Sequence, residues 1–221
     1  SFGKDSSCIL QWLKESGNID KVTVVFIDCG GLYPDIEEWA KTEGSKLPKF
    51  EYIKAPGNVW DDVRQKGFPV DIEISELGAF SAGFMDHPLA GKYKIRDWKN
   101  CIAERVWKPL AIVTEIMQPD LVITGERRKD RPYANDWAQR NFGAKVIRPI
   151  FDWTDEQVWS YIDKHSIPLA KSFQGRQKDR RDCWLCLGGH DLTAGRMAEL
   201  KQDWPDLHHK LFVEEGFGEV L

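Results

Sequence analysis

The first six residues of the chain, Ser-Phe-Gly-Lys-Asp-Ser, combine the chemical groups that bind an oxyanion. Gly3 allows the backbone to approach an anion closely, Lys4 brings a positive charge, and Ser1 and Ser6 bring hydroxyl donors. A helix is predicted directly afterwards, and its first N–H groups and its dipole favour negative charge. The spacing differs from that of the GxxxxGK[ST] phosphate loop. The segment therefore predicts a polyphosphate or sulfate site, with a capped helix start as the alternative.

Cysteines form the second candidate site. Cys183 and Cys186 make a C-x-x-C pair, whose thiolates can share one metal centre. Cys101, on a long predicted helix, is the candidate third ligand, and His190 is the candidate fourth. The five cysteines are too few and too scattered for a disulfide scaffold, and their odd number favours reduced thiols. The remaining two, Cys8 and Cys29, are predicted to behave as small buried hydrophobes.

Basic residues follow a predicted strand and also precede the C-x-x-C pair. Arg127 and Arg128 come directly after the strand-end Gly125, and their planar guanidinium groups suit phosphate or sulfate. A solvated charged loop is the alternative. The second group can neutralise an anionic cluster or substrate, contact a phosphate backbone, or form a solvated loop: Lys171, Arg176, Lys178, Arg180 and Arg181.

Strands alternating with helices must position these residues. Hydrophobic patterning predicts strands over 22–27, 50–54, 120–124 and 145–147, and helices over 5–15, 36–43, 98–117 and 154–165. A capping box of Thr154 and Gln157 begins the last helix, and Pro109 is a candidate bend. The alternation predicts an α/β fold with a doubly wound, mostly parallel sheet and flanking helices, which binds ligands at the carboxyl ends of its strands.

Composition and organisation narrow the class of protein. The 221 residues carry a net charge of −4, which excludes a surface that is basic all over. No apolar run long enough for a membrane span and no leader are present, so a cytoplasmic protein without membrane contact is expected. The predicted domains are 1–170, with a long excursion over 67–97, and a small cysteine-containing region over 171–221. The strand expected before the opening loop is missing, which indicates that the natural N-terminus is absent.

The opening loop resembles that of the PP-loop superfamily, specifically its phosphoadenylylsulfate (PAPS) reductase branch. Four further stretches resemble that branch in the expected order: 26–30 with 32–34, 101–110, 123–128, and 148–154 with 158–159. The resemblance implies an adenine nucleotide alpha hydrolase-like, Rossmann-like fold that binds an adenine nucleotide.

The resemblance also implies roles for individual residues. The opening loop residues would hold phosphate or sulfate oxygens, and Asp5 would shape the loop. Asp28 and Gly125 would lie at adjacent strand ends near the base and the ribose. Arg127 and Arg128 would face the anionic end, so that the catalytic candidates are Lys4, Arg127 and Arg128.

In the iron–sulfur subgroup of this branch, a tandem Cys-Cys and a distant C-x-x-C hold a 4Fe–4S cluster. Here Asn100-Cys101-Ile102 supplies one cysteine of the tandem pair. The resemblance therefore implies a cluster on Cys101, Cys183 and Cys186 that leaves one iron open or takes a different ligand there. Zinc on these three residues and His190 is one alternative, and a metal-free pair is the other.

Three functional hypotheses remain open. Thiol-dependent reductases of the branch carry a cysteine in a Glu-Cys-Gly-Leu-His stretch near the C-terminus, and no cysteine follows Cys186 here. The leading hypothesis is therefore an ATP pyrophosphatase that uses Mg²⁺ and adenylylates an acceptor for attack by sulfur. The acceptor would be RNA, DNA (phosphorothioation) or a small molecule, with a cysteine desulfurase as the expected partner. The alternatives are sulfite-forming reduction of PAPS or adenylylsulfate (APS) with a thioredoxin-like partner, and a non-catalytic nucleotide-binding subunit of a sulfur-transfer assembly.

Overall fold

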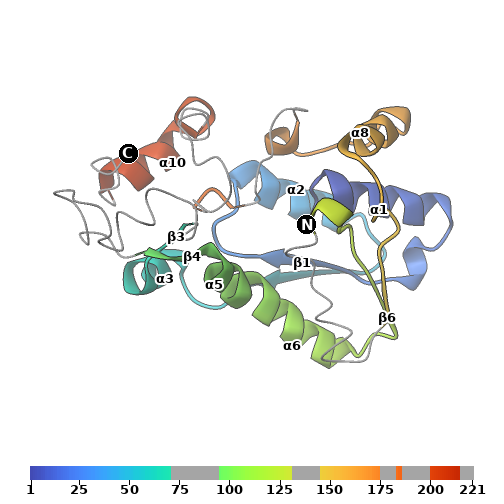
Figure 1. Ribbon diagram of the computed structural model, residues 1–221, viewed down its shortest axis with the longest axis horizontal. Coiled ribbons are helices and arrows are strands. Elements are labelled where there is room, and N and C mark those ends of the chain that lie inside the picture. The colour runs from blue at the N-terminus through green and yellow to red at the C-terminus, as the bar shows by residue number, and fades with distance from the viewer. Residues whose placement is uncertain (71–94, 131–144, 175–182, 186–199, 215–221) are drawn as a thin grey trace. The chain divides into compact units, whose positions relative to one another are not determined.

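The computed structural model describes residues 1–70, 95–130, 145–174, 183–185 and 200–214 (Figure 1). They form two compact units. Unit 1 comprises 1–28, 32–55 and the described part of 106–182. Unit 2 comprises 29–31 and the described parts of 56–105 and 183–221. The units interleave along the chain, so they differ from the division into 1–170 and 171–221, which stays a prediction about domains.

Unit 1 alternates helices with short apolar strands, as the sequence pattern predicts. Its strands are β1 (Val24–Asp28), β2 (Phe50–Lys54), β5 (Leu121–Ile123) and β6 (Lys145–Ile147). Its α-helices are α1 (Lys4–Glu15), α2 (Pro34–Gly44), α6 (Lys108–Met117) and α8 (Asp155–Lys164), and short 3-10 turns cover Ile19–Lys21, Arg128–Asp130 and Lys171–Phe173. Figure 1 shows α1 and α2 on one side of β1 and α6 on the other side.

The described strands pair in parallel. β1 pairs with β2 from Val24 opposite Phe50 to Asp28 opposite Lys54. β5 pairs with β6 from Leu121 opposite Lys145 to Ile123 opposite Ile147. Parallel pairing brings the carboxyl ends of paired strands to one edge. The predicted α/β class with parallel strands and flanking helices is therefore confirmed.

The core of unit 1 lies around α1 and α8. One cluster joins Cys8 of α1 to Val158 and Ile162 of α8 and to Leu169, and a second joins Ile9 and Leu13 to Ile150. The predicted capping box is present, since Thr154 Oγ1 accepts from Gln157 N and Gln157 Oε1 accepts from Thr154 N. This packing and capping fix the start of α8 beside the start of α1.

Unit 2 contains α3 (Val59–Lys66), β3 (Phe68–Val70), β4 (Ile95–Asp97), α5 (Trp98–Ile102) and α10 (Pro205–His209), which a π-helical turn over Lys210–Glu214 follows. β3 and β4 pair in parallel, so strands form both ends of the predicted long excursion. Residues 71–94 of that segment lie outside the described residues.

The predicted helix over 98–117 is helical throughout, with a π-helical turn over Ala103–Trp107 between α5 and α6. Pro109 explains the irregular turn, because its ring nitrogen cannot donate the i to i−4 bond of a regular helix.

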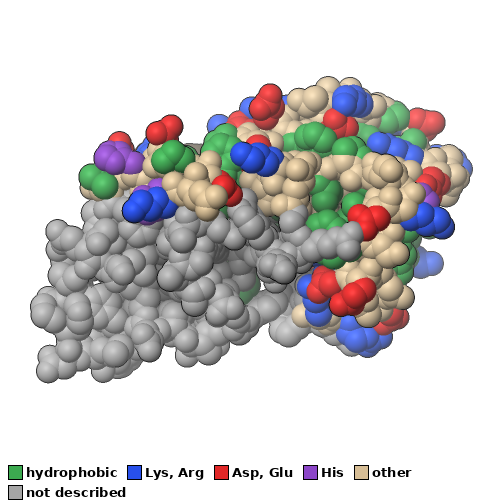
Figure 2. Space-filling model, turned by 90° about the horizontal axis from the view of Figure 1, so that it is seen from above, with side chains coloured by type: hydrophobic (Ala, Val, Ile, Leu, Met, Phe, Trp, Pro, Cys, Tyr) green, Lys and Arg blue, Asp and Glu red, His purple; other side chains and the backbone are tan. Residues whose placement is uncertain are grey.

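Acidic and basic side chains are interspersed on the face of the described residues in Figure 2. None of the described helices combines the length and the hydropathy that crossing a membrane requires.

Candidate functional site

The opening loop is anchored on the β1–β2 pair through its aromatic residue. Phe2 is buried, and its ring centroid lies 5.8 Å from that of Phe26 and 6.0 Å from that of Phe50. Ser7 Oγ donates to Phe2 O over 3.1 Å and closes the turn. The apolar Phe2 within a polar loop therefore fixes where α1 begins.

The first turn of α1 presents backbone donors. Gly3 is its N-cap in an extended conformation, and no side chain caps the helix at this position. The first intrahelical bond runs from Ser7 N to Gly3 O over 2.9 Å, so the N–H groups of Lys4, Asp5 and Ser6 have no acceptor within the helix. The hydroxyl oxygens of Ser1 and Ser6 lie 3.1 Å apart beside this turn. These are the donors that an oxyanion accepts from.

Gly125, directly beyond β5, comes very close to this turn. A Cβ atom on Gly125 would lie 3.1 Å from the carbonyl carbon of Asp5 and 3.2 Å from Ser6 N. Both neighbours are backbone atoms, so a side chain at position 125 would push the strand-end loop away from α1. The close approach of these backbone atoms therefore favours glycine at position 125.

The loop after β5 is tied to the segment that leads into α8. Thr124 N donates to Ile147 O over 3.1 Å, and Arg128 N donates to Phe151 O over 2.7 Å. Glu126 and Arg148 form an ion pair of 2.9 Å between Oε2 and Nε. The 123–128 and 148–154 stretches, which the resemblance singled out separately, are thus joined in the structure.

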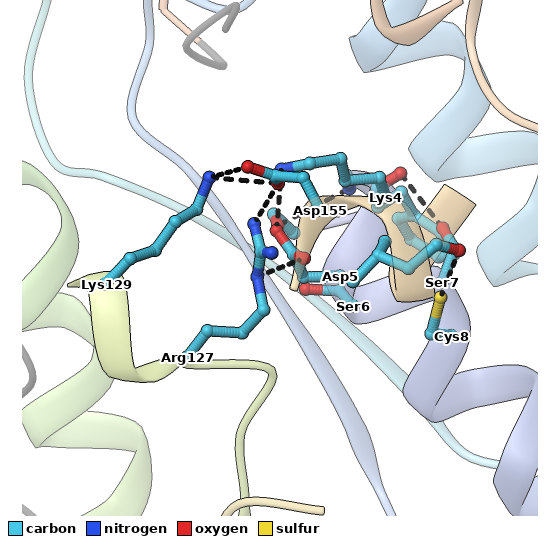
Figure 3. A network of polar contacts seen from close by, with 12 residues as sticks. Lys4, Asp5, Ser6, Ser7, Cys8, Arg127, Lys129 and Asp155 are labelled. Carbon is cyan, nitrogen blue, oxygen red and sulfur yellow. Dashed lines mark hydrogen bonds and ion pairs between the residues drawn. The ribbon is translucent and has the colours of Figure 1, made fainter. Parts of the chain in front are cut away.

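A network of charges converges on the start of α1 (Figure 3). Arg127 is only 1% exposed, and its Nε lies 2.8 Å from Asp5 Oδ1 while its Nη2 donates to Asp155 Oδ1 over 2.7 Å. Lys129 Nζ donates to both carboxylate oxygens of Asp155, over 3.0 and 2.8 Å. Lys4 Nζ donates to Asp5 Oδ2 over 3.0 Å and lies 4.0 Å from Asp155 Oδ1. Three cations and two carboxylates therefore share this network.

The surroundings of Asp155 keep its carboxyl group ionised. Partial burial alone would raise its pKa, but hydrogen bonds from Lys129 and Arg127, together with their charges, outweigh burial and lower the pKa to about 2. The carboxylate is therefore negative throughout the neutral range.

The two arginines after β5 differ in their surroundings. Arg127 lies inside the network and touches α1 through Asp5. Arg128 is exposed, forms an ion pair with Asp152, and has its guanidinium carbon 4.9 Å from the centroid of the Phe151 ring. The resemblance implies the same role for both arginines, whereas only Arg127 contacts the loop in the structure.

Asp28 lies at the carboxyl end of β1. Its side chain is buried and accepts from the Tyr52 hydroxyl over 2.9 Å, and its backbone oxygen accepts from Ala55 N over 2.8 Å. It thus stands at the strand end, where the resemblance expects the base or ribose of a nucleotide.

The cysteines separate into core residues and candidate ligands. Burial raises the pKa of the Cys8 thiol to about 12, in keeping with a core side chain, and Cys29 is also buried. Cys101 and Cys183 both lie in unit 2, whereas Cys186, His190 and most of the basic segment before them lie outside the described residues. Within the described ranges, no group of three or more metal-ligating side chains is present.

Cys101 and Cys183 each meet an arrangement that suits a sulfur ligand. Arg96 is buried, and its Nη2 donates to Cys101 Sγ over 3.2 Å. A Cβ on Gly31 would lie 2.7 Å from Cys183 Sγ, so the absence of a side chain at Gly31 makes room for the sulfur. A charged donor beside a sulfur is of the kind that supports metal-binding thiolates from outside the metal's own ligands.

Sequence reasoning missed four residues of these arrangements: Lys129, Asp155, Arg96 and Arg105. Lys129 directly follows the two arginines in a charged stretch of the sequence, and Asp155 has the acidic character that any first helical turn favours. Arg105 is buried in unit 2 and donates through Nε to Cys29 O over 2.5 Å. The spacing of Arg127 and Asp155 in the sequence gives no signal that they touch.

Comparisons with known proteins identify relatives by sequence. Residues 85–176 match the phosphoadenosine phosphosulfate reductase domain family, a segment that includes Cys101, Gly125, Arg127 and Asp155. The chain is 29% identical to an adenosine 5′-phosphosulfate reductase of Halalkalibacterium halodurans, an alignment that covers 79% of this chain and 90% of that protein. It is 25% identical to a phosphoadenosine 5′-phosphosulfate reductase of Xylella fastidiosa, over 76% of this chain and 62% of that protein.

Among solved structures, a PAPS reductase from Candida auris in a phosphate complex matches with a TM-score of 0.50 at 16% identity. The match covers 82% of this chain and 77% of that chain, and it supports the Rossmann-like α/β fold. The resemblance predicted from the sequence is thus confirmed.

Proposed function

Since this chain is a relative of PAPS and APS reductases within the PP-loop superfamily, we propose that it binds the anionic end of an adenine sulfonucleotide at the start of α1 and acts on it in sulfur chemistry. The observation that carries the proposal is the uncapped first turn of α1, which Lys4 accompanies and Gly125 approaches closely. Helix N-termini of this kind favour phosphate and sulfate groups.

Each part of the site has a chemical task under this proposal. The N–H groups of residues 4–6 and the hydroxyls of Ser1 and Ser6 donate to phosphate or sulfate oxygens, and Lys4 adds positive charge. Asp28 and Gly125 lie at the strand ends near which the ribose and the base would bind. Arg127 acts through Asp5, so it is a positioning residue and not a direct ligand.

The proposed reaction is reduction at the sulfonyl sulfur. A thiolate of a dithiol partner of the thioredoxin type attacks that sulfur, the bond from sulfur to the phosphate oxygen breaks, and the adenosine phosphate leaves with the electron pair. The second thiol of the partner then attacks the sulfur that carries the sulfonate, which forms the partner's disulfide and releases sulfite. Donors that surround the departing phosphate favour this step because negative charge develops on it.

Cleavage of ATP between its α- and β-phosphates is a second candidate. Residues 187–221 contain no cysteine, so none of these residues supplies a thiolate for attack on a sulfonucleotide. The same donors suit the phosphates of ATP, which Mg²⁺ would bridge. The adenylylated acceptor would then be attacked by sulfur that a cysteine desulfurase supplies.

Binding and product assays together test these candidates. Calorimetry should detect binding of APS, PAPS or ATP to the wild-type chain, and Lys4→Met should weaken it. Sulfite formed from APS or PAPS with thioredoxin supports the first candidate, and pyrophosphate formed from ATP and Mg²⁺ with an RNA, DNA or small-molecule acceptor supports the second. Binding without any product indicates a nucleotide-binding subunit. Failure of all three nucleotides to bind contradicts the proposal.

We also propose that Cys101, Cys183 and Cys186 hold a 4Fe–4S cluster, which would supply an open iron able to carry a sulfur ligand. The fit rests on the donor from Arg96 to Cys101 and on the space that Gly31 leaves beside Cys183. Protein purified without oxygen should be brown and contain iron and sulfide, and Cys101→Ser should lose both. Stoichiometric zinc without iron contradicts this proposal and indicates the zinc site.

A further inference from the structure

Asp155 belongs to none of the sequence motifs, and the proposed function assigns it no role. It is the first residue of α8, and in unit 1 its carboxylate receives two cations by hydrogen bonds and faces a third. Two of these three, Lys4 and Lys129, end in flexible ammonium groups that can change partner. The third, Arg127, is buried and also holds Asp5.

We propose that the Asp155 carboxylate is a resident counter-ion that an incoming phosphate or sulfate group displaces from Lys4 and Lys129. This proposal rests on the proposed function, because it places the anion at the start of α1. Lys4 Nζ is already 4.0 Å from Asp155 Oδ1 and belongs to the turn whose N–H groups would bind the anion. Arg127 keeps its ion pairs with Asp5 and Asp155, so the starts of α1 and α8 stay joined while the lysines change partner.

Charge counting supports an exchange of counter-ions. Lys4, Arg127 and Lys129 carry three positive charges against the two negative charges of Asp5 and Asp155, so one positive charge remains for a ligand. An anion that bears two or more charges needs a further cation, which it obtains by drawing Lys129 or Lys4 away from Asp155. Because the pKa of Asp155 is about 2, protonation does not release these lysines at neutral pH, and only a competing anion does.

The effect of Asp155→Asn on anion affinity distinguishes two possible roles of Asp155, because the two roles predict effects of opposite sign. If Asp155 competes with the ligand for its cations, Asp155→Asn tightens anion binding. If Asp155 only orders Arg127 and Lys129 for the ligand, the same change weakens binding. A unit charge at about 4 Å in a solvated site corresponds to at least ~1 kcal/mol, so the expected gain is about fivefold in affinity or more.

Calorimetry with inorganic pyrophosphate tests the inference, and APS in parallel tests the proposed function. Asp155→Asn should bind pyrophosphate about fivefold more tightly than wild type at low salt. The matched control is Glu156→Gln, which removes the same charge from the neighbouring residue and should change affinity by less than about twofold. Lys129→Met should weaken binding, and adding Asp155→Asn to it should give a smaller gain than in wild type.

The outcomes separate the two proposals. Weaker or unchanged pyrophosphate binding by folded Asp155→Asn overturns the counter-ion role, and so does an equal gain from Glu156→Gln. If wild type binds APS while Asp155→Asn binds pyrophosphate less well, only this inference fails. If wild type binds pyrophosphate but neither APS, PAPS nor ATP, the proposed function fails and the sign of the Asp155→Asn effect still decides the inference. Should Asp155→Asn not fold, the Lys129→Met variant decides, since unchanged pyrophosphate affinity there overturns the exchange.

Discussion

At the scale of single residues, Arg127 shows how a buried charge contributes to an anion site without reaching into it. Its guanidinium joins Asp5 of α1 to Asp155 of α8, so that one side chain sets the distance between two helix starts. Removing one member of a buried ion pair is costly, because the remaining charges lose their partner in a partly desolvated place.

Replacing Arg127 should therefore destabilise the fold more than replacing its neighbour. We expect Arg127→Met to lower the free energy of unfolding by about 2 kcal/mol, less than for a fully buried pair because both carboxylates are partly exposed. Arg128→Met, which removes an exposed pair with Asp152, should cost less than about 1 kcal/mol. Urea unfolding of the two variants and wild type measures the difference. Equal losses would contradict the role of Arg127 in joining Asp5 to Asp155.

A substitution at Gly125 tests its close approach to the first turn of α1. Gly125→Ala places a methyl group about 3 Å from backbone atoms of Asp5 and Ser6, so the strand-end loop must move. We expect a loss of about 1–3 kcal/mol in stability and weaker nucleotide binding. The control is Gly17→Ala, where a positive φ is strained but no atom lies within 4 Å. It should lower stability without changing nucleotide affinity, as calorimetry would record.

Among the secondary-structure elements, the start of α8 is the feature that the sequence predicts most clearly. The contacts of the first residue of that helix are not predicted. The capping box of Thr154 and Gln157 follows from local sequence alone, and so do the bounds of β2 and β6. The contact between Asp155 and Arg127 does not, because it depends on how α8 packs against α1 and on the loop after β5. Local patterns predict where a helix starts, and tertiary packing decides what its first side chain touches.

The depressed pKa of Asp155 predicts how the start of α8 responds to acid. A group whose pKa falls on folding, here from 3.8 to about 2, stabilises the fold above the higher value and loses this contribution as pH falls through the lower one. The difference in melting temperature between wild type and Asp155→Asn should therefore be constant near neutral pH and shrink as the pH falls from about 4 towards 2. A difference that grows in acid would show that Asp155 is not held ionised by its partners.

At the scale of the whole molecule, the sequence predicted the α/β class, the parallel pairing and the family resemblance, but not the arrangement into compact units. Alternating apolar segments predict which parts are strands, whereas unit 2 combines 29–31 with segments far away in sequence. Gly31 illustrates the difficulty, because its close approach to Cys183 joins residues about 150 positions apart. No local pattern carries that information.

The opening loop, Gly125 and Asp155 all belong to unit 1. Ligand binding should therefore slow hydrogen exchange in that unit. Hydrogen exchange with a saturating adenine nucleotide should slow the amides of residues 4–6, since the ligand accepts from them, and those of 124–129, since they lie against that turn. A ligand at 100 times its dissociation constant adds about 2.7 kcal/mol of stability to the state that binds it. Lys4→Met at the same nucleotide concentration should show less protection of both segments. Protection confined to unit 2, for example over α3 and α5, would place the nucleotide elsewhere and contradict a site at the start of α1.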